Sequence, residues 1–138
     1  MEKITRNKEN FIIMTVIYNV LNDFKAIDKS PSRDINEIIY ELTDIPLDKH
    51  SPFAQNLLTT VLTRYGEIVS AITPHLNEWK WSRLPLLTQA ILLMSYARYH
   101  YMEKVDKRII ISVAIELAKK YIEEKQAKFI NAILDEVL

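Results

Sequence analysis

The chain has 138 residues, and its 18 basic and 18 acidic side chains give a formal net charge of zero at pH 7. This balance argues against a general polyanion-binding surface, so any contact with nucleic acid must come from a local patch. The absence of cysteine excludes disulfides, thiolate metal sites and a cysteine nucleophile.

Residues that interrupt a helix are scarce: Gly66 is the single glycine, and there are five prolines. So few backbone breakers favour long helices with short connections over a turn-rich β protein. Apolar residues recur at helical spacing, and no apolar run reaches the length of a membrane span. We therefore expect an all-α protein of about seven helices, located in the cytoplasm and not inserted in a membrane.

The first predicted helix covers about residues 9–24. Its apolar face is broader than a surface helix needs, which is typical of a central core helix. A break follows at 28–32, where Pro31 stops the helix and Ser32 can cap the next one. The second helix is predicted at 33–42.

The third predicted helix begins at Ser51-Pro52, a sequence with an N-cap serine followed by proline at the first helical position. It continues to about Arg64. Apolar periodicity resumes at Ile68, beyond Gly66. We expect either one helix bent near Gly66 or two helices that meet there.

Three further apolar segments make up the C-terminal half. Ser82 is expected to cap a helix at about 84–101, which is apolar all round over much of its length and therefore buried. Asp106 can cap the next helix. A short charged break at 123–126 then leads to a last amphipathic helix at 127–138.

The last helix should pack on the two helices that precede it. We expect Phe129 and Ile133 to contact the apolar segment 86–94 and the face formed by 114–118. If the Phe129 ring is fully buried, its replacement by alanine should cost about 3 to 5 kcal/mol of stability.

Catalytic and metal-binding patterns are missing from the sequence. His50, His75 and His100 lie far apart, and no His-Glu-x-x-His motif accompanies them. No serine has the glycines of a nucleophile elbow around it. We expect a protein that is not an enzyme and that has no catalytic residue, metal site or cofactor.

Two local basic features could bind nucleic acid. Arg6-Asn7-Lys8 precedes the first predicted helix, where basic side chains and free N–H groups can pair with phosphates. The alternative is an ordinary solvated terminus. The second feature runs from Arg98 to Arg108 beside several tyrosines, whose rings could stack on unpaired bases. Its alternative is a polar connection between helices.

An ordered series of motifs occupies residues 79–138. It consists of Trp79 with Arg83 and Leu84, then 90–92, 114–121 and 128–135. In composition and spacing the series resembles the C-terminal half of the NusB family. The match is close over roughly 60 residues and extends to the remainder only as a helix pattern.

This resemblance implies one domain, 1–138, in which helical halves at about 1–78 and 79–138 pack as two sub-bundles. It also implies a role without a cofactor in bacterial transcription antitermination of ribosomal RNA operons. The expected partners are ribosomal protein S10 (NusE), a boxA-type RNA and the transcription elongation complex. The alternative is a NusB-fold protein-interaction module that has lost RNA binding. Both a monomer and a homodimer remain open.

The arginine-rich segment of the family falls at residues 5–10 of this chain. Only Arg6 and Lys8 are basic there, while Asn7 and Asn10 stand where arginines are usual. With so few cations, RNA binding by this protein alone should be weak and salt-dependent. The resemblance and the second basic feature together give four candidate RNA contacts: Arg6, Lys8, Tyr18 and Arg98.

Overall fold

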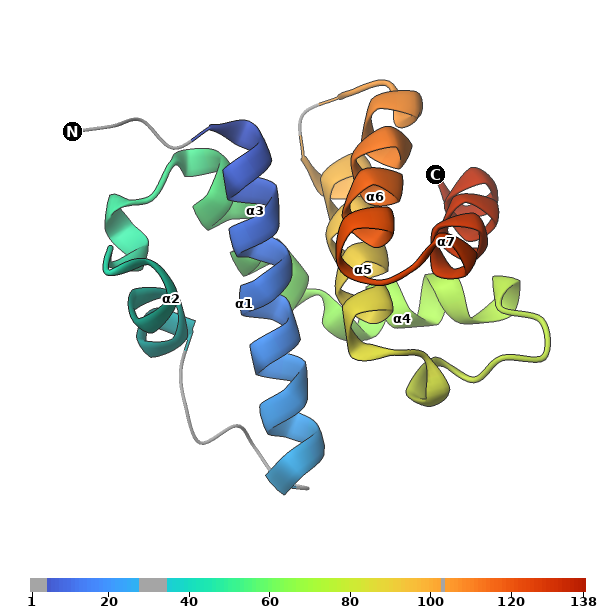
Figure 1. The fold of residues 1–138 in the computed structure, drawn as a ribbon, viewed down its shortest axis with the longest axis horizontal. Coiled ribbons are helices and arrows are strands. Elements are labelled where there is room, and N and C mark those ends of the chain that lie inside the picture. Colours follow the sequence, from blue (N-terminus) through green and yellow to red (C-terminus); the bar gives the residue numbers. More distant parts are fainter. Residues whose placement is uncertain (1–4, 28–34, 103) are drawn as a thin grey trace.

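The computed structural model describes residues 5–27, 35–102 and 104–138. These residues form seven α-helices and three short 3₁₀ helices, and no strand occurs among them (Figure 1). The α-helices are α1 Arg6–Ile27, α2 Ile35–Thr43, α3 Pro52–Thr63, α4 Tyr65–Ile72, α5 Leu86–Tyr101, α6 Lys107–Tyr121 and α7 Glu124–Val137. The 3₁₀ helices are η1 Leu47–Lys49, η2 Thr73–His75 and η3 Trp81–Arg83. The all-α prediction is confirmed.

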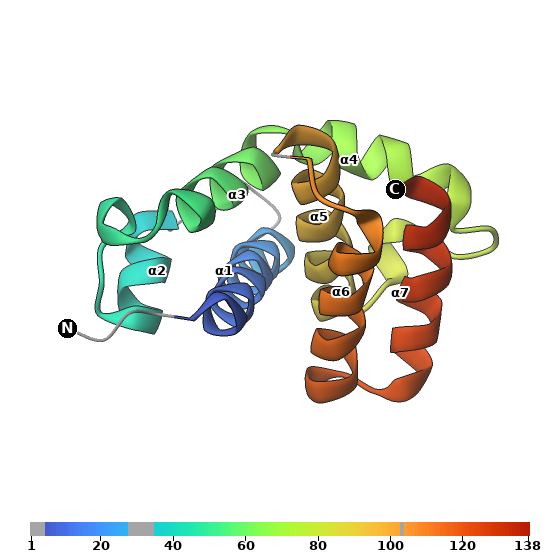
Figure 2. The ribbon, with the colours of Figure 1, turned by 90° about the horizontal axis from the view of Figure 1, so that it is seen from above.

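Two packed groups of helices make up the molecule (Figures 1 and 2). In one group, α1 packs on α2 and α3, and in the other, α5 packs on α4, α6 and α7. The long helices α1 and α5 contact each other and join the groups. Two packed sub-bundles are confirmed, although α4 lies within residues 1–78 and packs with α5 in the second group. The arrangement brings the first turn of α1 close to the C-terminal part of α5.

The core has α1 and α5 at its centre. The buried residues of α1 form the broad apolar face that the sequence predicts, and every residue of α5 from 88 to 95 is buried. The two buried polar side chains at the start of α5 are hydrogen-bonded. Thr88 Oγ1 donates to Gln126 Oε1 at 2.8 Å, and Gln89 Nε2 donates to the Trp81 carbonyl at 2.9 Å. These bonds satisfy polar groups that would otherwise destabilise the core.

Three local predictions at helix ends are confirmed. The Ser51 side chain caps α3 by accepting from the Ala54 amide at 3.1 Å. The Asp106 carboxylate caps α6 by accepting from the Arg108 amide at 2.9 Å, and the hydrogen bonds from Arg108 lower the pKa of Asp106 to about 2. Two helices, α3 and α4, meet at Arg64, whose φ of −112° and ψ of 18° interrupt the helix.

Three predicted boundaries differ from the structure. The helix α5 begins at Leu86 because Pro85 occupies the N-cap, so Ser82 lies in η3 and does not cap α5. The helix α7 already begins at Glu124, within the predicted break. Its first turn is polar and largely exposed, so apolar periodicity does not reveal it, and Gln126 accepts a hydrogen bond from Thr88 of α5. The predicted break and cap at Pro31 and Ser32, with the start of the second helix, lie outside the described residues.

The first helix begins at Arg6, earlier than predicted. Thr5 provides the missing signal, because its carbonyl accepts from the Glu9 amide at 2.9 Å and its hydroxyl from the Lys8 amide at 3.2 Å. Arg6 and Lys8 therefore belong to the first turn of α1 instead of preceding it. Residues two apart on a helix point to different sides, so these cations diverge.

Packing of the last helix is partly as predicted. Ile133 is buried, but Phe129 is only half-buried and lies on the edge of the core. Its ring meets the Trp79 ring edge-on, with centroids 6.3 Å apart, and the Trp79 side chain is itself 59% exposed. The condition of a fully buried Phe129 ring is therefore not met, so the larger loss of stability tied to it is not expected.

Candidate nucleic-acid interface

Two arginines from distant parts of the chain converge on one aromatic ring. Arg6, in the first turn of α1, has its Cζ 3.7 Å from the centroid of the Phe53 ring. Arg98, near the end of α5, has its Cζ 5.1 Å from the same centroid. Phe53 lies in the first turn of α3, so the meeting of α1, α3 and α5 builds this site. Both distances are within the range of cation–π attraction.

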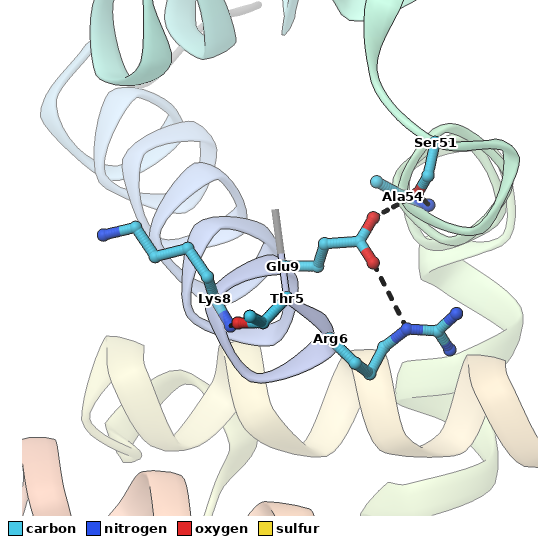
Figure 3. A network of polar contacts seen from close by, with 6 residues as sticks. All are labelled: Thr5, Arg6, Lys8, Glu9, Ser51 and Ala54. Atoms are coloured by element: carbon cyan, nitrogen blue, oxygen red, sulfur yellow. Dashed lines mark hydrogen bonds and ion pairs between the residues drawn. The ribbon is translucent and has the colours of Figure 1, made fainter. Parts of the chain in front are cut away.

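A buried carboxylate orients Arg6 and ties α1 to α3 (Figure 3). The Glu9 side chain is only 9% exposed and accepts from Arg6 Nε at 3.2 Å through one oxygen. Its other oxygen accepts from the Ser51 hydroxyl, which also caps α3. A buried carboxylate is stable only with such partners. The network therefore holds Arg6 beside Phe53.

A groove of 520 Å³ runs along α3 and past the C-terminal end of α5. Amide and hydroxyl side chains also line it, and no acidic residue occurs among the described residues that line it. They are Arg6, Pro52, Phe53, Gln55, Asn56, Thr59, Thr60, Arg98, Tyr101, Met102 and Val105. We refer to this as the arginine groove.

The electrostatics of the arginine groove favour an anion. Burial lowers the pKa of Arg98, and the positive charge of Arg6 lowers it further. The two guanidinium groups repel each other over the same ring, and Glu9 pairs with only one of them, so a further negatively charged group beside them would be stabilising. Guanidinium groups bind phosphate and carboxylate oxygens in pairs, so phosphate is a fitting occupant.

The four candidate contacts do not form a single cluster. Arg6 and Arg98 line the arginine groove together. Lys8 points away from Arg6 (Figure 3), and its Nζ lies 5.0 Å from the centroid of the Phe11 ring. Tyr18 is half-buried and lies about 18 Å further along α1, at about 1.5 Å per residue.

Two parts of this site do not follow from the sequence. Phe53 fits the pattern of an inward apolar residue of its helix, and nothing in the sequence links that ring to residues 6 and 98. The network of Glu9 and Ser51 is the second part. The spacing of Arg6 and Glu9 was a usable signal, since residues three apart on a helix are neighbours, but it required knowing that the helix starts at Arg6.

Ser51→Ala is expected to lower the free energy of unfolding by about 1 to 2 kcal/mol, because the change removes the N-cap of α3 and one partner of Glu9. Urea denaturation followed by circular dichroism measures the loss. Ser70→Ala, at an exposed position within α4, is the matched control and should change stability by less than about 0.5 kcal/mol. Equal effects of the two changes would contradict this role of Ser51.

The fold and this site define a class of protein: a small all-helical protein with a cationic, aromatic groove where its two sub-bundles meet. The sequence model of the NusB family matches residues 9–138. The chain belongs to the NusB family.

Individual relatives agree with this assignment. The transcription antitermination protein NusB of Listeria welshimeri is 30% identical over 112 residues, which cover 80% of this chain and 88% of the relative. The NusB protein of Chloroherpeton thalassium is 27% identical over 132 residues, which cover 96% of this chain and 60% of the relative.

Solved structures share the fold at low sequence identity. T. maritima NusB superimposes with a TM-score of 0.81 at 21% identity, covering 99% of this chain and 92% of that one. A crystal structure of the antitermination factors NusB and NusE in complex with dsRNA contains a chain with a TM-score of 0.75 at 21% identity. That match covers 96% of this chain and 94% of the other.

Proposed function

We propose that this protein is an RNA- and protein-binding adaptor in transcription antitermination of ribosomal RNA operons. It acts with ribosomal protein S10 (NusE) on a boxA-type RNA within the transcription elongation complex. The observation that carries the proposal is the arginine groove, where two guanidinium groups face one ring with no acidic neighbour among the described lining residues. The relatives named as antitermination proteins, and the solved complex of NusB, NusE and dsRNA, support it.

The chemistry of the arginine groove suits an RNA backbone. Arg6 and Arg98 offer planar donor groups to phosphate oxygens, and both lie within cation–π distance of the Phe53 ring. The amide of Asn56 can hydrogen-bond to base edges or riboses that follow, whereas Gln55 Nε2 already donates to the His50 carbonyl at 2.7 Å. The protein binds and positions RNA without chemical change and without a cofactor.

Few cations contact the RNA in this arrangement, so binding by the protein alone is weak and S10 supplies further contacts. We propose that residues 1–138 act as one domain, as a monomer or homodimer, in the cytoplasm. None of the helices in the described ranges is both long and apolar enough to cross a membrane.

A second candidate function is a protein-interaction module that kept the fold and lost RNA binding. Two observations favour it. The charge of Arg6 is already paired with Glu9. Asn7 and Asn10 are uncharged, although they stand at positions where arginines are usual in the family. This module would bind S10 without RNA.

Titration of labelled boxA RNA with the protein, with S10 and with their complex distinguishes the two functions. We expect weak binding by the protein alone, tighter binding by the complex, and an affinity that falls steeply as salt rises. Calorimetry measures the binding of S10 itself. A complex that forms but holds no RNA would establish the interaction module, and failure to bind S10 would refute both functions.

A further inference from the structure

The outward face of α6 carries apolar side chains that its own chain does not cover. Figure 1 looks onto this helix, which lies in front of α5 and between α1 and α7. Ile109, in the first turn, is 53% exposed, and Ile115 is half-buried. Ile115 also lines a groove of 390 Å³ between α6 and α7. Exposed aliphatic side chains beside a groove are typical of a surface that binds another protein.

Opposite charges border the same face, about two helical turns apart. Arg108 lies near the start of α6 and Glu116 in its second half, and both are exposed and line the groove. Arg108 pairs with Asp106 at 2.9 Å, but a guanidinium group has five N–H donors and can bind a second carboxylate as well. Glu116 forms no ion pair or hydrogen bond with any residue in the described ranges, so its charge is available to a partner.

The spacing of these residues makes the face its own complement. Arg108, Ser112 and Glu116 are four residues apart and so form one ridge of the helix. Such ridges of two helices pack side by side when the helix axes cross at about −50°. With a two-fold axis beside Ser112, the ridges run in opposite directions, and Arg108 of each copy faces Glu116 of the other. Ile109 then meets its counterpart, as does Ile115, and the small Ser112 lets the helices approach closely.

We propose that this chain forms a symmetric dimer through the surface of Arg108, Ile109, Ser112, Ile115 and Glu116, which we refer to as the α6 ridge. The occupant is a second copy because of the charges. A wholly basic or wholly acidic partner would be repelled at one end of the α6 ridge, whereas an antiparallel second copy pairs both ends. The net charge of zero adds no general repulsion between the copies.

This inference goes beyond the proposed RNA-binding function and does not depend on it, since the α6 ridge shares no residue with the arginine groove. The dimer should be weak, because a single helix crossing buries less than the roughly 1,200 to 2,000 Å² of a standard interface. The isoleucines supply most of the affinity, and the exposed ion pairs mainly fix the orientation. We expect a dissociation constant on the order of tens of micromolar.

Sedimentation equilibrium of the full chain, at concentrations on either side of this value, measures the association. Arg108→Glu should weaken the dimer about tenfold or more, because two attractive contacts become repulsive, and Glu116→Arg should do the same. Both side chains are exposed, so helix content and melting temperature should hardly change. Circular dichroism checks that each variant is folded.

Mixing the two variants tests the pairing itself. One copy then presents acidic side chains at both ends of the α6 ridge and the other presents basic ones, so both antiparallel pairs form again. An equal mixture should associate about as tightly as the unaltered protein, although each variant alone is largely monomeric. Damage to the fold would not be repaired by mixing, so this result separates direct pairing from an indirect effect.

Lys128→Glu is the control, because it makes the same charge change as Arg108→Glu at an exposed position of α7 that lines neither groove. This variant should dimerise like the unaltered protein. An unaltered protein that stays monomeric at all concentrations, a dimer that survives Arg108→Glu, or variants that do not associate when mixed would each overturn the inference. An equal loss of the dimer in Lys128→Glu would also overturn it, since net charge would then be the cause.

Discussion

Replacing both Arg6 and Arg98 by glutamine is expected to weaken RNA binding by the S10 complex about tenfold or more for each arginine. The reason is that each guanidinium forms charge-assisted hydrogen bonds to phosphate, and one such bond contributes about 1.5 to 3 kcal/mol. The slope of log affinity against log salt should also decrease by about 0.7 for each lost phosphate contact on single-stranded RNA. RNA titrations at several salt concentrations measure both quantities.

The double variant should lose about 1 to 2 kcal/mol of stability, because the Glu9 carboxylate is only 9% exposed and loses the charge of one of its two partners. A melting curve beside each titration separates this loss from the loss of RNA affinity. In the unaltered protein, burial and then the positive charge of Arg6 lower the pKa of Arg98. Removing both charges ends this repulsion. Glutamine is preferable to glutamate here, because a glutamate at position 6 would face the buried carboxylate of Glu9.

Arg108→Gln provides the matched control for the charge change. Arg108 is exposed, pairs with Asp106 at 2.9 Å, and lies outside the arginine groove. Its loss should leave both RNA affinity and the salt slope nearly unchanged. If Arg108→Gln and the groove variant weaken binding equally, the effect belongs to net charge and the arginine groove is not the RNA site.

Leu134→Ala is expected to lower the free energy of unfolding by about 2 to 5 kcal/mol. The Leu134 side chain is fully buried on α7, in the core that α7 shares with α5 and α6. Truncation removes apolar contacts and leaves a cavity that the surrounding helices cannot fill. Urea denaturation monitored by circular dichroism gives the change, with the midpoint falling at constant slope.

Phe129→Ala is the comparison within the same helix. Its ring is half-buried against the exposed Trp79, so the expected loss is only about 1 to 2 kcal/mol, despite the larger side chain. An equal or greater loss for Phe129 would mean that the core extends over that edge of α7. A loss below about 1 kcal/mol for Leu134 would mean that α7 is peripheral to stability.

Most helices of this protein follow from local sequence. Periodic apolar positions predict α1, α5 and α6, and the side-chain caps at Ser51 and Asp106 mark two helix starts correctly. Such signals succeed because the spacing of apolar residues and the hydrogen bonds of a cap involve neighbours in the chain. The start of α1 was missed because a threonine cap at Thr5 outweighs the polar composition of the turn that follows.

The candidate site depends on contacts that no local pattern contains. Sequence singled out Arg6 and Arg98 separately, but the packing of α1 and α5 on α3 brings both to Phe53. Because α1 begins at Arg6, Lys8 points to another side of the helix, and Tyr18 lies about three turns further along it.

The sequence by itself determined the helices, the apolar faces that must be buried and the family to which the chain belongs. Tertiary structure alone decided which polar side chains share a hollow and which apolar rings stay half-exposed. The physical reason is that apolar burial is non-directional and follows a repeating pattern, so periodicity reveals it. A binding site instead depends on distances of a few ångströms between side chains far apart in sequence, and those distances are set only when the helices pack.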